Sequence, residues 1–378
     1  MKPVIPCAGG VVGTAPGVRV PPERRRWPSA GVPHLRSRWK RASLMAAVAL
    51  VAAQGALVNV HLGRSSAVTL PAPAAAGALG RAVDPTTMIA DPDVLVGRRA
   101  DYLYSSATGY STPYLPVRTF HVLGRWGRPT DAMPSLPPWA DSWIWNPDVR
   151  LVGGRYVMWF TAPLRGAALP TTRGPPRCLG WATASSPLGP FHPAAEPSVC
   201  QMGWFGAIDP QTLMAPGSQE WLYWKSDGNS VPRAHQPTII WAQRLAADGV
   251  TLEGRRVAIL SDRQPWEGTV VESPQMVGED GRYYLFFSGN VSGSALMGIG
   301  VARCRGPAGP CANPERGPWL GSVQDGRPVG EESLFYEDGA TWLLYSPKGL
   351  FQTLMVSMVA FGPRGPYVAD FGRLPGAR

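Results

Sequence analysis

A chain of 378 residues with 44 Gly, 41 Pro, 15 Trp and only 16% charged residues does not have the composition of a helical bundle. Its net charge of +10 comes almost entirely from residues 1–80, where ten Lys or Arg and one acidic residue, Glu23, leave only +1 for the rest. A surface that binds phosphates needs clustered cations on the folded body, so the charge distribution predicts no nucleic-acid partner.

The first 83 residues predict a targeting region with three parts. Residues 1–43 form a basic Pro/Arg-rich leader, residues 44–60 an apolar run, and residues 61–83 an Ala/Pro-rich linker. The apolar run is short of the roughly 20 residues that span a bilayer, so it is either a signal-peptide core or a signal-anchor helix. Both alternatives predict that the rest of the chain is secreted or lies at the outer face of the cytoplasmic membrane, with membrane contact only through the anchor.

The cysteines of the body predict disulfides. Cys7 lies in the leader, which leaves Cys178, Cys200, Cys304 and Cys311. Four cysteines in an exported chain allow three connectivities, of which the local pairing of Cys178 with Cys200 and of Cys304 with Cys311 is the simplest. A zinc site is the alternative, but the body has no C-x-x-C pair and its histidines are scattered singly.

From residue 84 to residue 378 one pattern recurs five times. An acidic or small polar residue, usually before Pro, is followed by a short apolar run, a turn centred on Gly or Asp, and an aromatic-rich strand. The copies begin at Asp91, Asn146, Asp209, Ser273 and Glu332, at spacings of 55, 63, 64 and 59 residues. Such a repeat, without any sustained helical period, predicts an all-β fold, a five-bladed β-propeller with one hairpin-based blade per copy. A β-sandwich with coincidental repeats is the alternative.

The starts of these repeats gather acidic residues. The innermost strands of propeller blades line a central channel, and their starts meet at one mouth. The repeats begin with Asp91, Asn146, Asp209, the Glu272-Ser273 pair and the Glu331-Glu332 pair. Carboxyl groups crowded at one mouth have pKa values that spread apart, which is what the acid and the base of glycosidic bond hydrolysis require.

Five segments resemble glycoside hydrolase family 43. They are Ala90–Val94, Trp145–Val149, Cys178–Phe191, Ala207–Pro210 and Val271–Gln275. The resemblance extends over residues 84–370 and implies a five-bladed propeller that cleaves arabinofuranosyl or β-xylosyl linkages with inversion at the anomeric carbon. The alternative is a propeller that binds glycans outside the cell and has weakened catalysis.

The resemblance also implies catalytic roles. Asp91 matches the general base, Glu272 the general acid, and Asp209 the acid that orients Glu272 and tunes its protonation. Strand alternation places Asp93 on the same face as Asp91, which makes Asp93 the rival candidate for the base. Asp148, two residues after Asn146, is interpreted as a strand-start cap.

Aromatic and polar residues near the blade starts are candidate substrate contacts, because sugars stack their C–H faces on aromatic rings. The candidates are Trp145, Asn146, Trp204, Trp224 and Arg303. Packing between blades is the alternative for the tryptophans, and a solvated surface position is the alternative for Arg303.

The resemblance implies no required cofactor, a polysaccharide or oligosaccharide as partner, and a monomer. Many members of that family have a histidine in the fifth blade, near an axial calcium or water, but this chain has Gly330-Glu-Glu-Ser333 there. The missing histidine counts against calcium. Glu331 and Glu332 are either replacement oxygen ligands or turn acids.

Overall fold

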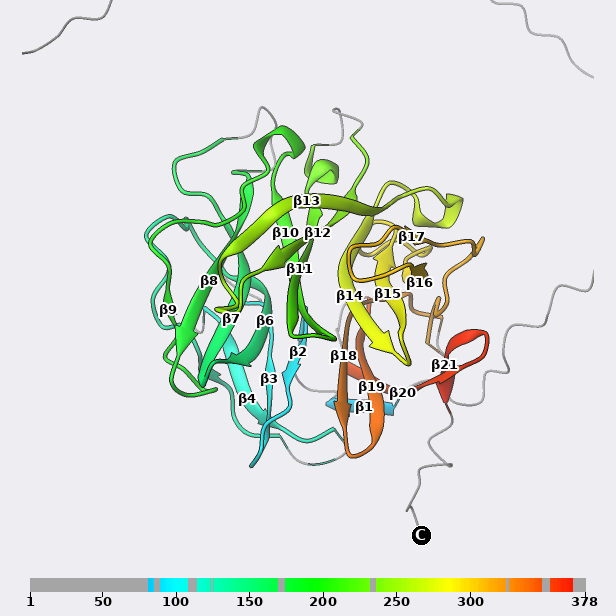
Figure 1. The fold of residues 1–378 in the computed structure, drawn as a ribbon, viewed down its shortest axis with the longest axis horizontal. Helices are drawn as coiled ribbons and strands as arrows, with labels where there is room; N and C mark the ends of the chain where they lie inside the picture. The colour runs from blue at the N-terminus through cyan, green and yellow to red at the C-terminus, as the bar shows by residue number, and fades with distance from the viewer. Residues whose placement is uncertain are drawn as a thin grey trace, which may run out of the picture. The chain divides into compact units, whose positions relative to one another are not determined.

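The computed structural model describes residues 81–84, 89–107, 114–122, 124, 126–168, 174–231, 236–323, 326–348 and 354–369. These residues form five antiparallel sheets arranged as the blades of a β-propeller (Figure 1). The helical elements of the described residues are short 3-10 turns, among them η1 (Met202–Trp204), η2 (Gly228–Ser230) and η4 (Pro265–Glu267). The predicted five-bladed, all-β fold is confirmed.

Four blades contain four strands each, in sequence order from the axis outward. Blade 1 consists of β2 (Asp93–Leu95), β3 (Asp101–Tyr104), β4 (Pro116–Phe120) and β5 (Thr130–Asp131). Blade 2 consists of β6 (Trp145–Val152), β7 (Arg155–Pro163), β8 (Arg177–Ala184) and β9 (His192–Pro193). Blade 3 consists of β10 (Ala207–Ala215), β11 (Gln219–Ser226), β12 (Ile239–Leu245) and β13 (Leu252–Ser261). Blade 4 consists of β14 (Val271–Glu279), β15 (Arg282–Gly289), β16 (Gly298–Cys304) and β17 (Cys311–Ala312).

Blade 5 joins the two ends of the propeller chain. Its strands are β18 (Val329–Glu337), β19 (Ala340–Pro347), β20 (Leu354–Gly362), β21 (Gly365–Ala369) and β1 (Arg81–Asp84). β1 pairs with the first residues of β20 and β21 with its last, so two strands from opposite ends of the sequence share β20. Arg81 therefore already belongs to the propeller, three residues before the boundary at residue 84 that the sequence suggested.

The turns between first and second strands follow from their residues. In blades 2, 4 and 5 the turn is a two-residue loop with positive φ at both positions: Gly153-Gly154, Asp280-Gly281 and Asp338-Gly339. Only glycine, and to a lesser degree Asp or Asn, adopts this backbone readily, and the resulting turn matches the twist of a hairpin. The prediction of Gly- or Asp-centred turns is confirmed for these three blades.

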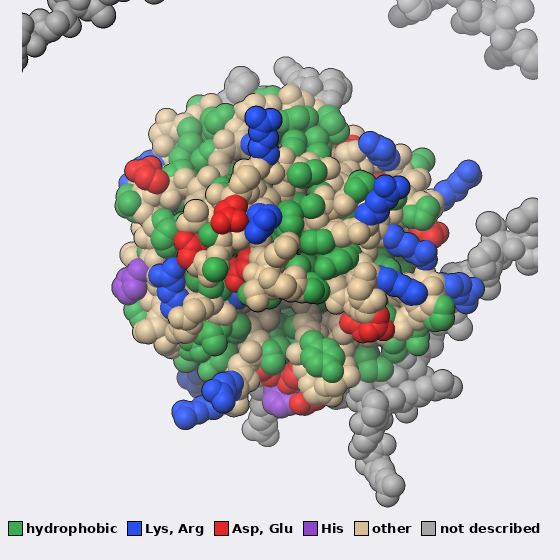
Figure 2. Space-filling model, in the orientation of Figure 1, with side chains coloured by type: hydrophobic (Ala, Val, Ile, Leu, Met, Phe, Trp, Pro, Cys, Tyr) green, Lys and Arg blue, Asp and Glu red, His purple; other side chains and the backbone are tan. Residues whose placement is uncertain are grey.

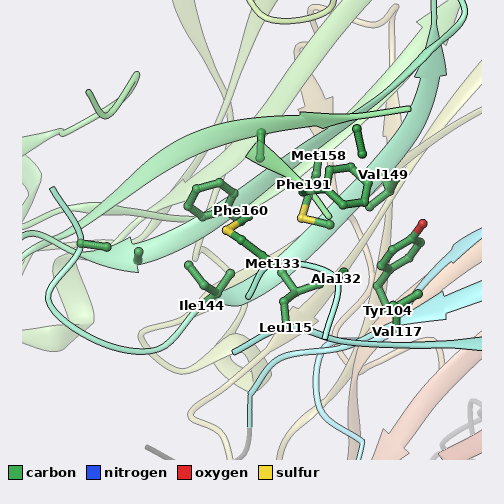
Figure 3. Packing of buried hydrophobic residues seen from close by; sticks show 14 of the residues in the cluster. Tyr104, Leu115, Val117, Ala132, Met133, Ile144, Val149, Met158, Phe160 and Phe191 are labelled. Atoms are coloured by element: carbon green, nitrogen blue, oxygen red, sulfur yellow. The ribbon is translucent and has the colours of Figure 1, made fainter. Parts of the chain in front are cut away.

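The hydrophobic core consists of five clusters, and each lies between two neighbouring blades. In the cluster between blades 1 and 2, Tyr104 and Val117 of the first blade pack with Val149, Met158 and Phe160 of the second (Figure 3). Another cluster joins blade 5 back to blade 1. Because burial of apolar surface is distributed around the whole ring, no blade has a core of its own.

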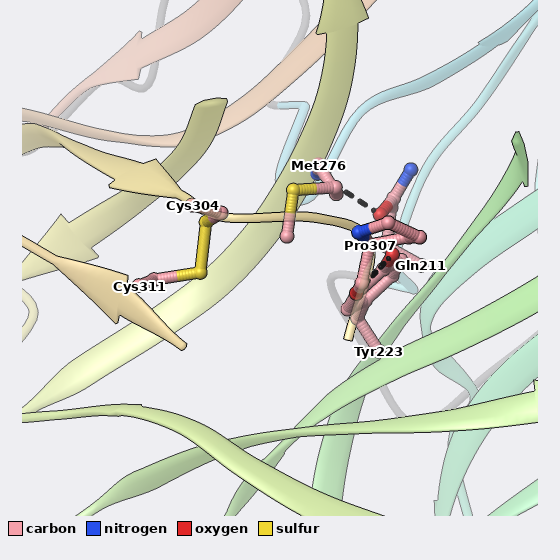
Figure 4. Close-up of a disulfide and its surroundings, with 6 residues drawn as sticks. All are labelled: Gln211, Tyr223, Met276, Cys304, Pro307 and Cys311. Carbon is pink, nitrogen blue, oxygen red and sulfur yellow. Dashed lines mark hydrogen bonds between the residues drawn. A yellow bond between two sulfur atoms is a disulfide. The ribbon is translucent and has the colours of Figure 1, made fainter. Parts of the chain in front are cut away.

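Both locally paired disulfides are present. Cys178 is bonded to Cys200 and Cys304 to Cys311, with Cα–Cα separations of 4.6 and 4.0 Å. The second bond closes a short loop in blade 4 that also contacts blade 3, since the Tyr223 hydroxyl donates to the Pro307 carbonyl at 2.8 Å (Figure 4). The predicted pairing is confirmed.

The leader, the apolar run and most of the linker, residues 1–80, lie outside the described residues. Within the described residues, no helix has the length and apolar character that crossing a bilayer requires. On the face shown in Figure 2, basic side chains gather toward the right-hand side, whereas acidic ones lie apart from one another among broad uncharged areas.

Candidate active site

The innermost strands begin with one unusual backbone feature that recurs in every blade. A non-glycine residue adopts the left-handed conformation, with φ between 47° and 58°. These residues are Asp91, Asn146, Asp209, Ser273 and Glu331. The fifth repeat therefore starts at Glu331 and not at Glu332, because the register shift of β18 lies between Gly330 and Ser333, as it lies between Glu272 and Gln275 in β14.

Hydrogen bonds from one blade to the next hold these strained residues in place. A positive φ is uncommon for residues with a side chain, so the surrounding contacts must fix it. The backbone N–H groups of Asn146, Asp209 and Glu331 donate to hydroxyls of the preceding blade, at 2.9, 3.2 and 2.9 Å. The accepting residues are Ser106, Thr161 and Ser288.

Two residues further along, polar side chains connect adjacent inner strands. Asp93 accepts a hydrogen bond from the Val149 N–H at 2.9 Å, and Asp148 accepts one from the Thr212 N–H at 3.1 Å. The Gln211 side chain accepts a hydrogen bond from the Met276 N–H at 3.1 Å. Asp93 thus joins blade 1 to blade 2 and is not placed as a rival to Asp91. Asp148 joins blade 2 to blade 3 in the middle of β10, so its role is structural, but it is not the strand-start cap that the sequence suggested.

The five left-handed residues surround a narrow cavity on the propeller axis. Its lining comes from all five blades and includes the carboxyl-bearing residues Asp91, Asp209, Glu331 and Glu332. About 30 Å³ of the cavity is open to water-sized molecules. We call the end of the propeller at which these strands begin the mouth. The structure thus brings Asp91, Asn146 and Asp209 together, with Glu272 immediately before the lining residue Ser273.

Asp91 is half-buried among other acidic groups. The Ser106 hydroxyl donates to its Oδ2. Burial raises the pKa of Asp91 well above its ordinary value, and the charges of Glu331 and Asp209 raise it further, while the Ser106 hydrogen bond and the Lys348 ammonium oppose the shift. Asp91 is therefore a base that is stronger than an exposed aspartate.

Asp209 lies between two other candidate residues. Its Oδ2 accepts a hydrogen bond from the Ser273 N–H at 2.9 Å, in the strand that carries Glu272. The pKa of Asp209 is raised to about 7, mainly by burial. The Lys225 ammonium opposes this rise, and the charge of Glu272 adds to it. Asp209 therefore exchanges a proton near neutral pH and senses the charge on Glu272.

Glu272 is bonded to a buried lysine. Nζ of Lys225 donates to Oε2 of Glu272 at 2.9 Å and lies 4.0 Å from Oδ1 of Asp227. The other oxygen of Asp227, Oδ2, accepts a hydrogen bond from Arg177 Nη1 at 2.7 Å. Burial alone would lower the pKa of Lys225, but the charges of Glu272, Asp209 and Asp227 outweigh it and raise the pKa. Lys225 is thus a permanent cation shared by three carboxylates.

The fifth blade contributes a second buried lysine. Lys348 forms an ion pair with Glu331 Oε1, and the Ser288 hydroxyl donates to Glu332 Oε2 at 2.6 Å. Glu331 Oε2 and Glu332 Oε1 have no hydrogen-bond partner. These residues nevertheless do not fit a calcium site, because the Lys348 ammonium already neutralises Glu331 and would repel a divalent cation.

Glu332→Gln tests the protonation of this buried carboxyl. Burial raises the pKa of Glu332 to about 8, so the folded state holds a proton that the unfolded state releases near pH 4.5. The wild type should therefore lose stability as the pH rises from about 4.5 to 8, by on the order of 4 kcal/mol from this group. The variant should lack this contribution and be the more stable protein at pH 8. Urea unfolding at both pH values measures it.

The matched control for that experiment is Glu196→Gln, which changes an exposed glutamate. This control should keep the pH dependence of the wild type. A Glu332→Gln variant with the same pH dependence as the wild type would contradict a protonated Glu332.

Two of the predicted substrate-contact tryptophans lie at the mouth. Trp145 is half-buried, stacks on Trp143 with ring centroids 5.4 Å apart, and has the Arg177 guanidinium 4.8 Å from its ring. Trp204 is half-buried in η1, just before β10, and meets Trp241 edge-on at 5.9 Å. Both rings keep exposed area beside the blade starts.

The structure contradicts two other predicted contacts. Trp224 is completely buried in the core between blades 2 and 3, where its Nε1 donates to Gln201 Oε1 at 3.0 Å. Arg303 lies in β16 four residues beyond Ile299, the residue level with Glu272, so it sits toward the end of blade 4 opposite the mouth. Its Nη2 donates to the Arg364 carbonyl of blade 5.

Several site residues were missed by sequence reasoning, namely Ser106, Arg177, Lys225, Asp227 and Lys348. One signal could have found the lysines: Lys225 and Lys348 are the only two after residue 80. Both lie at or just after the end of a second strand, β11 or β19. The others have no distinguishing pattern.

Comparisons with known proteins agree with this architecture. Among solved structures, the chain is similar to a thermostable family-43 glycoside hydrolase (TM-score 0.68, 22% identity, 79% of this chain and 99% of that one). It is also similar to two proteins from Bacteroides thetaiotaomicron VPI-5482. One is an endo-arabinase, with a TM-score of 0.60 and 20% identity over 76% of this chain and 98% of that one. The other is an endo-1,4-beta-xylanase, with a TM-score of 0.61 and 20% identity over 75% of this chain and 94% of that one. No curated protein sequence matches the chain.

The family comparison covers the propeller from just after β1 into β19. The sequence model described as glycosyl hydrolases family 43 matches residues 85–345, which is more than half of the chain. The matched region contains Asp91, Asp209 and Glu272. The chain therefore belongs to glycosyl hydrolase family 43 and is a glycosidase.

Proposed function

We propose that this enzyme hydrolyses arabinofuranosyl or β-xylosyl linkages in a polysaccharide, with inversion, using Asp91 as general base and Glu272 as general acid. One observation carries the proposal: acidic residues from three blades gather at one mouth, and each has a different electrostatic environment. Inverting hydrolysis needs two carboxyl groups in opposite protonation states.

Asp91 would activate the water that attacks the anomeric carbon. The water oxygen forms the new bond to that carbon while its proton passes to Asp91. The Ser106 hydroxyl fixes the orientation of the Asp91 carboxylate through Oδ2. Since burial raises its pKa, Asp91 binds the proton more strongly than an exposed aspartate would.

Glu272 would protonate the departing glycosidic oxygen as its bond to the anomeric carbon breaks. Because Lys225 donates to Oε2, we assign Oε1 as the oxygen that would carry the proton to the leaving group. Burial raises the pKa of Asp209 to about 7, so Asp209 can hold a proton near neutral pH beside the strand that carries Glu272. That proton would reach the leaving group through Glu272, and exchange with solvent would restore it after each turnover.

The sugar would be held at the mouth. Trp145 and Trp204 offer half-buried rings for stacking, and Asn146 shares the cavity lining with Asp91. The substrate class is supported by similarity to an α-L-arabinanase from Cellvibrio cellulosa whose structure is complexed with arabinohexaose.

We also propose that the enzyme works outside the cytoplasm. The basic leader and apolar run of residues 1–60 have the form of an export signal. The two disulfides support this location, because such bonds persist in oxidising compartments.

A substrate panel tests the activity. We expect release of 4-nitrophenol from 4-nitrophenyl α-L-arabinofuranoside or 4-nitrophenyl β-D-xyloside, and shortening of arabinan or xylan oligomers. Proton NMR during the first turnovers should show the product with the anomeric configuration opposite to that of the bond cleaved. Retained configuration would contradict the proposed roles, and oligosaccharide binding without any turnover would favour a glycan-binding protein instead.

A further inference from the structure

Lys348 is placed at the site without contacting any of the three proposed catalytic carboxyls. Its side chain is 3% exposed and forms an ion pair with Glu331, whose side chain is 15% exposed. Glu331 is the left-handed residue of blade 5 and shares the axial cavity lining with Asp91 of blade 1. The desolvation of two buried charges offsets most of the attraction between them. A contribution to stability therefore does not by itself account for this ion pair.

We propose that Lys348 and Glu331 form a positioning pair that sets the net charge beside Asp91 and thereby the lowest pH at which the enzyme works. The proposal rests on the proposed role of Asp91 as general base. Lys348 and Glu331 touch neither water nor sugar in this role. They act only through Asp91.

The charges that face Asp91 are few, and each can be named. Burial raises the pKa of Asp91 most, and the negative charges of Glu331 and Asp209 raise it further. The hydrogen bond from Ser106 and the positive charge of Lys348 lower it. Glu331 therefore disfavours an ionised Asp91 and Lys348 favours it. Glu331 has the larger effect of the two, so the pair leaves the pKa of Asp91 raised, and Lys348 limits how far it rises.

The second buried lysine provides the contrast. Lys225 donates directly to Glu272, so its removal alters a proposed catalytic group by contact. Lys348 reaches Asp91 only through space, with Glu331 as its bonded partner. A change at Lys348 should therefore move the pH dependence of turnover before it affects substrate affinity.

Two opposite variants test the pair. Lys348→Met leaves the Glu331 charge uncompensated beside Asp91, so the acidic limb of the pH profile of kcat/KM should move up by about 1 unit. Glu331→Gln leaves the Lys348 charge uncompensated, so the same limb should move down by a similar amount. The double variant should place the limb between those of the two single variants, and Lys348→Arg should keep the limb at its wild-type position.

The outcomes separate this proposal from the proposed function. If the wild type turns over no glycoside, the proposed function fails. If it is active but both single variants leave the limb unmoved, or move it in the same direction, the positioning pair is overturned. A structural role alone would lower activity equally at every pH. Should Lys348→Met not fold, the downward shift in Glu331→Gln decides the matter by itself.

Discussion

Glu272→Gln should reduce hydrolysis of arabinan or xylan oligomers about 10²- to 10⁴-fold, the usual contribution of a general acid. The same variant should retain most of its activity on aryl glycosides with good leaving groups, because a phenolate departs without protonation. Comparing kcat/KM for 4-nitrophenyl and unactivated substrates measures the difference. This split is the signature of a lost acid, whereas a general loss of folding would lower both activities together.

Asp91→Asn provides the complementary result. Water must be activated whichever group leaves, so this variant should lose activity on both substrate types alike. Asp93→Asn is the matched control, since an asparagine oxygen can still accept the Val149 N–H and keep blades 1 and 2 together. An inactive Asp93→Asn beside an active Asp91→Asn would reverse the assignment of the base.

Lys225→Met should be among the most destabilising substitutions in the protein. The Lys225 side chain is 1% exposed, and its removal leaves the carboxylates of Glu272 and Asp227 without their shared cation. Breaking one side of a buried ion pair costs roughly 3–5 kcal/mol. Carboxylates that have lost their cation can take up protons instead. The loss in the free energy of unfolding should therefore be smaller at pH 5 than at pH 8. Urea unfolding at the two pH values measures both effects.

The control for Lys225→Met is an ion pair at the surface. Arg244 and Glu253 are 3.6 Å apart and about half exposed, so Arg244→Met should cost roughly 0–1 kcal/mol at either pH. If Lys225→Met costs no more than Arg244→Met, the shared-cation description of the site is wrong.

The fold could be predicted because each blade repeats the same local chemistry. A polar residue before Pro, an apolar run and a Gly or Asp turn specify a hairpin without reference to the rest of the chain. The disulfides were predictable for the same reason, since each pair is close in sequence. Asp91 and Asp209 could be placed at one mouth because equivalent positions of propeller blades converge on the axis.

The errors arose where a residue's environment depends on distant parts of the chain. Trp224 sits on a strand that looks like any other aromatic strand, and only the packing of blade 2 against blade 3 buries it. Arg303 was misplaced because direction along a blade follows from strand order, which a short motif does not encode. The fifth repeat was assigned one residue late because Glu331 and Glu332 are chemically alike, and only the backbone conformation distinguishes them.

The burial of both propeller lysines has a practical consequence for chemical modification. Acylating and alkylating reagents need a solvent-accessible amine, and Lys225 and Lys348 are each at most 3% exposed. The only other lysines in the sequence are Lys2 and Lys40, both ahead of the propeller. Amine coupling of the folded enzyme to a dye or a solid support should therefore leave both propeller lysines, and with them the mouth, unmodified. Unfolding adds two further amines, so the number of labels per chain reports how much of a preparation has lost its propeller.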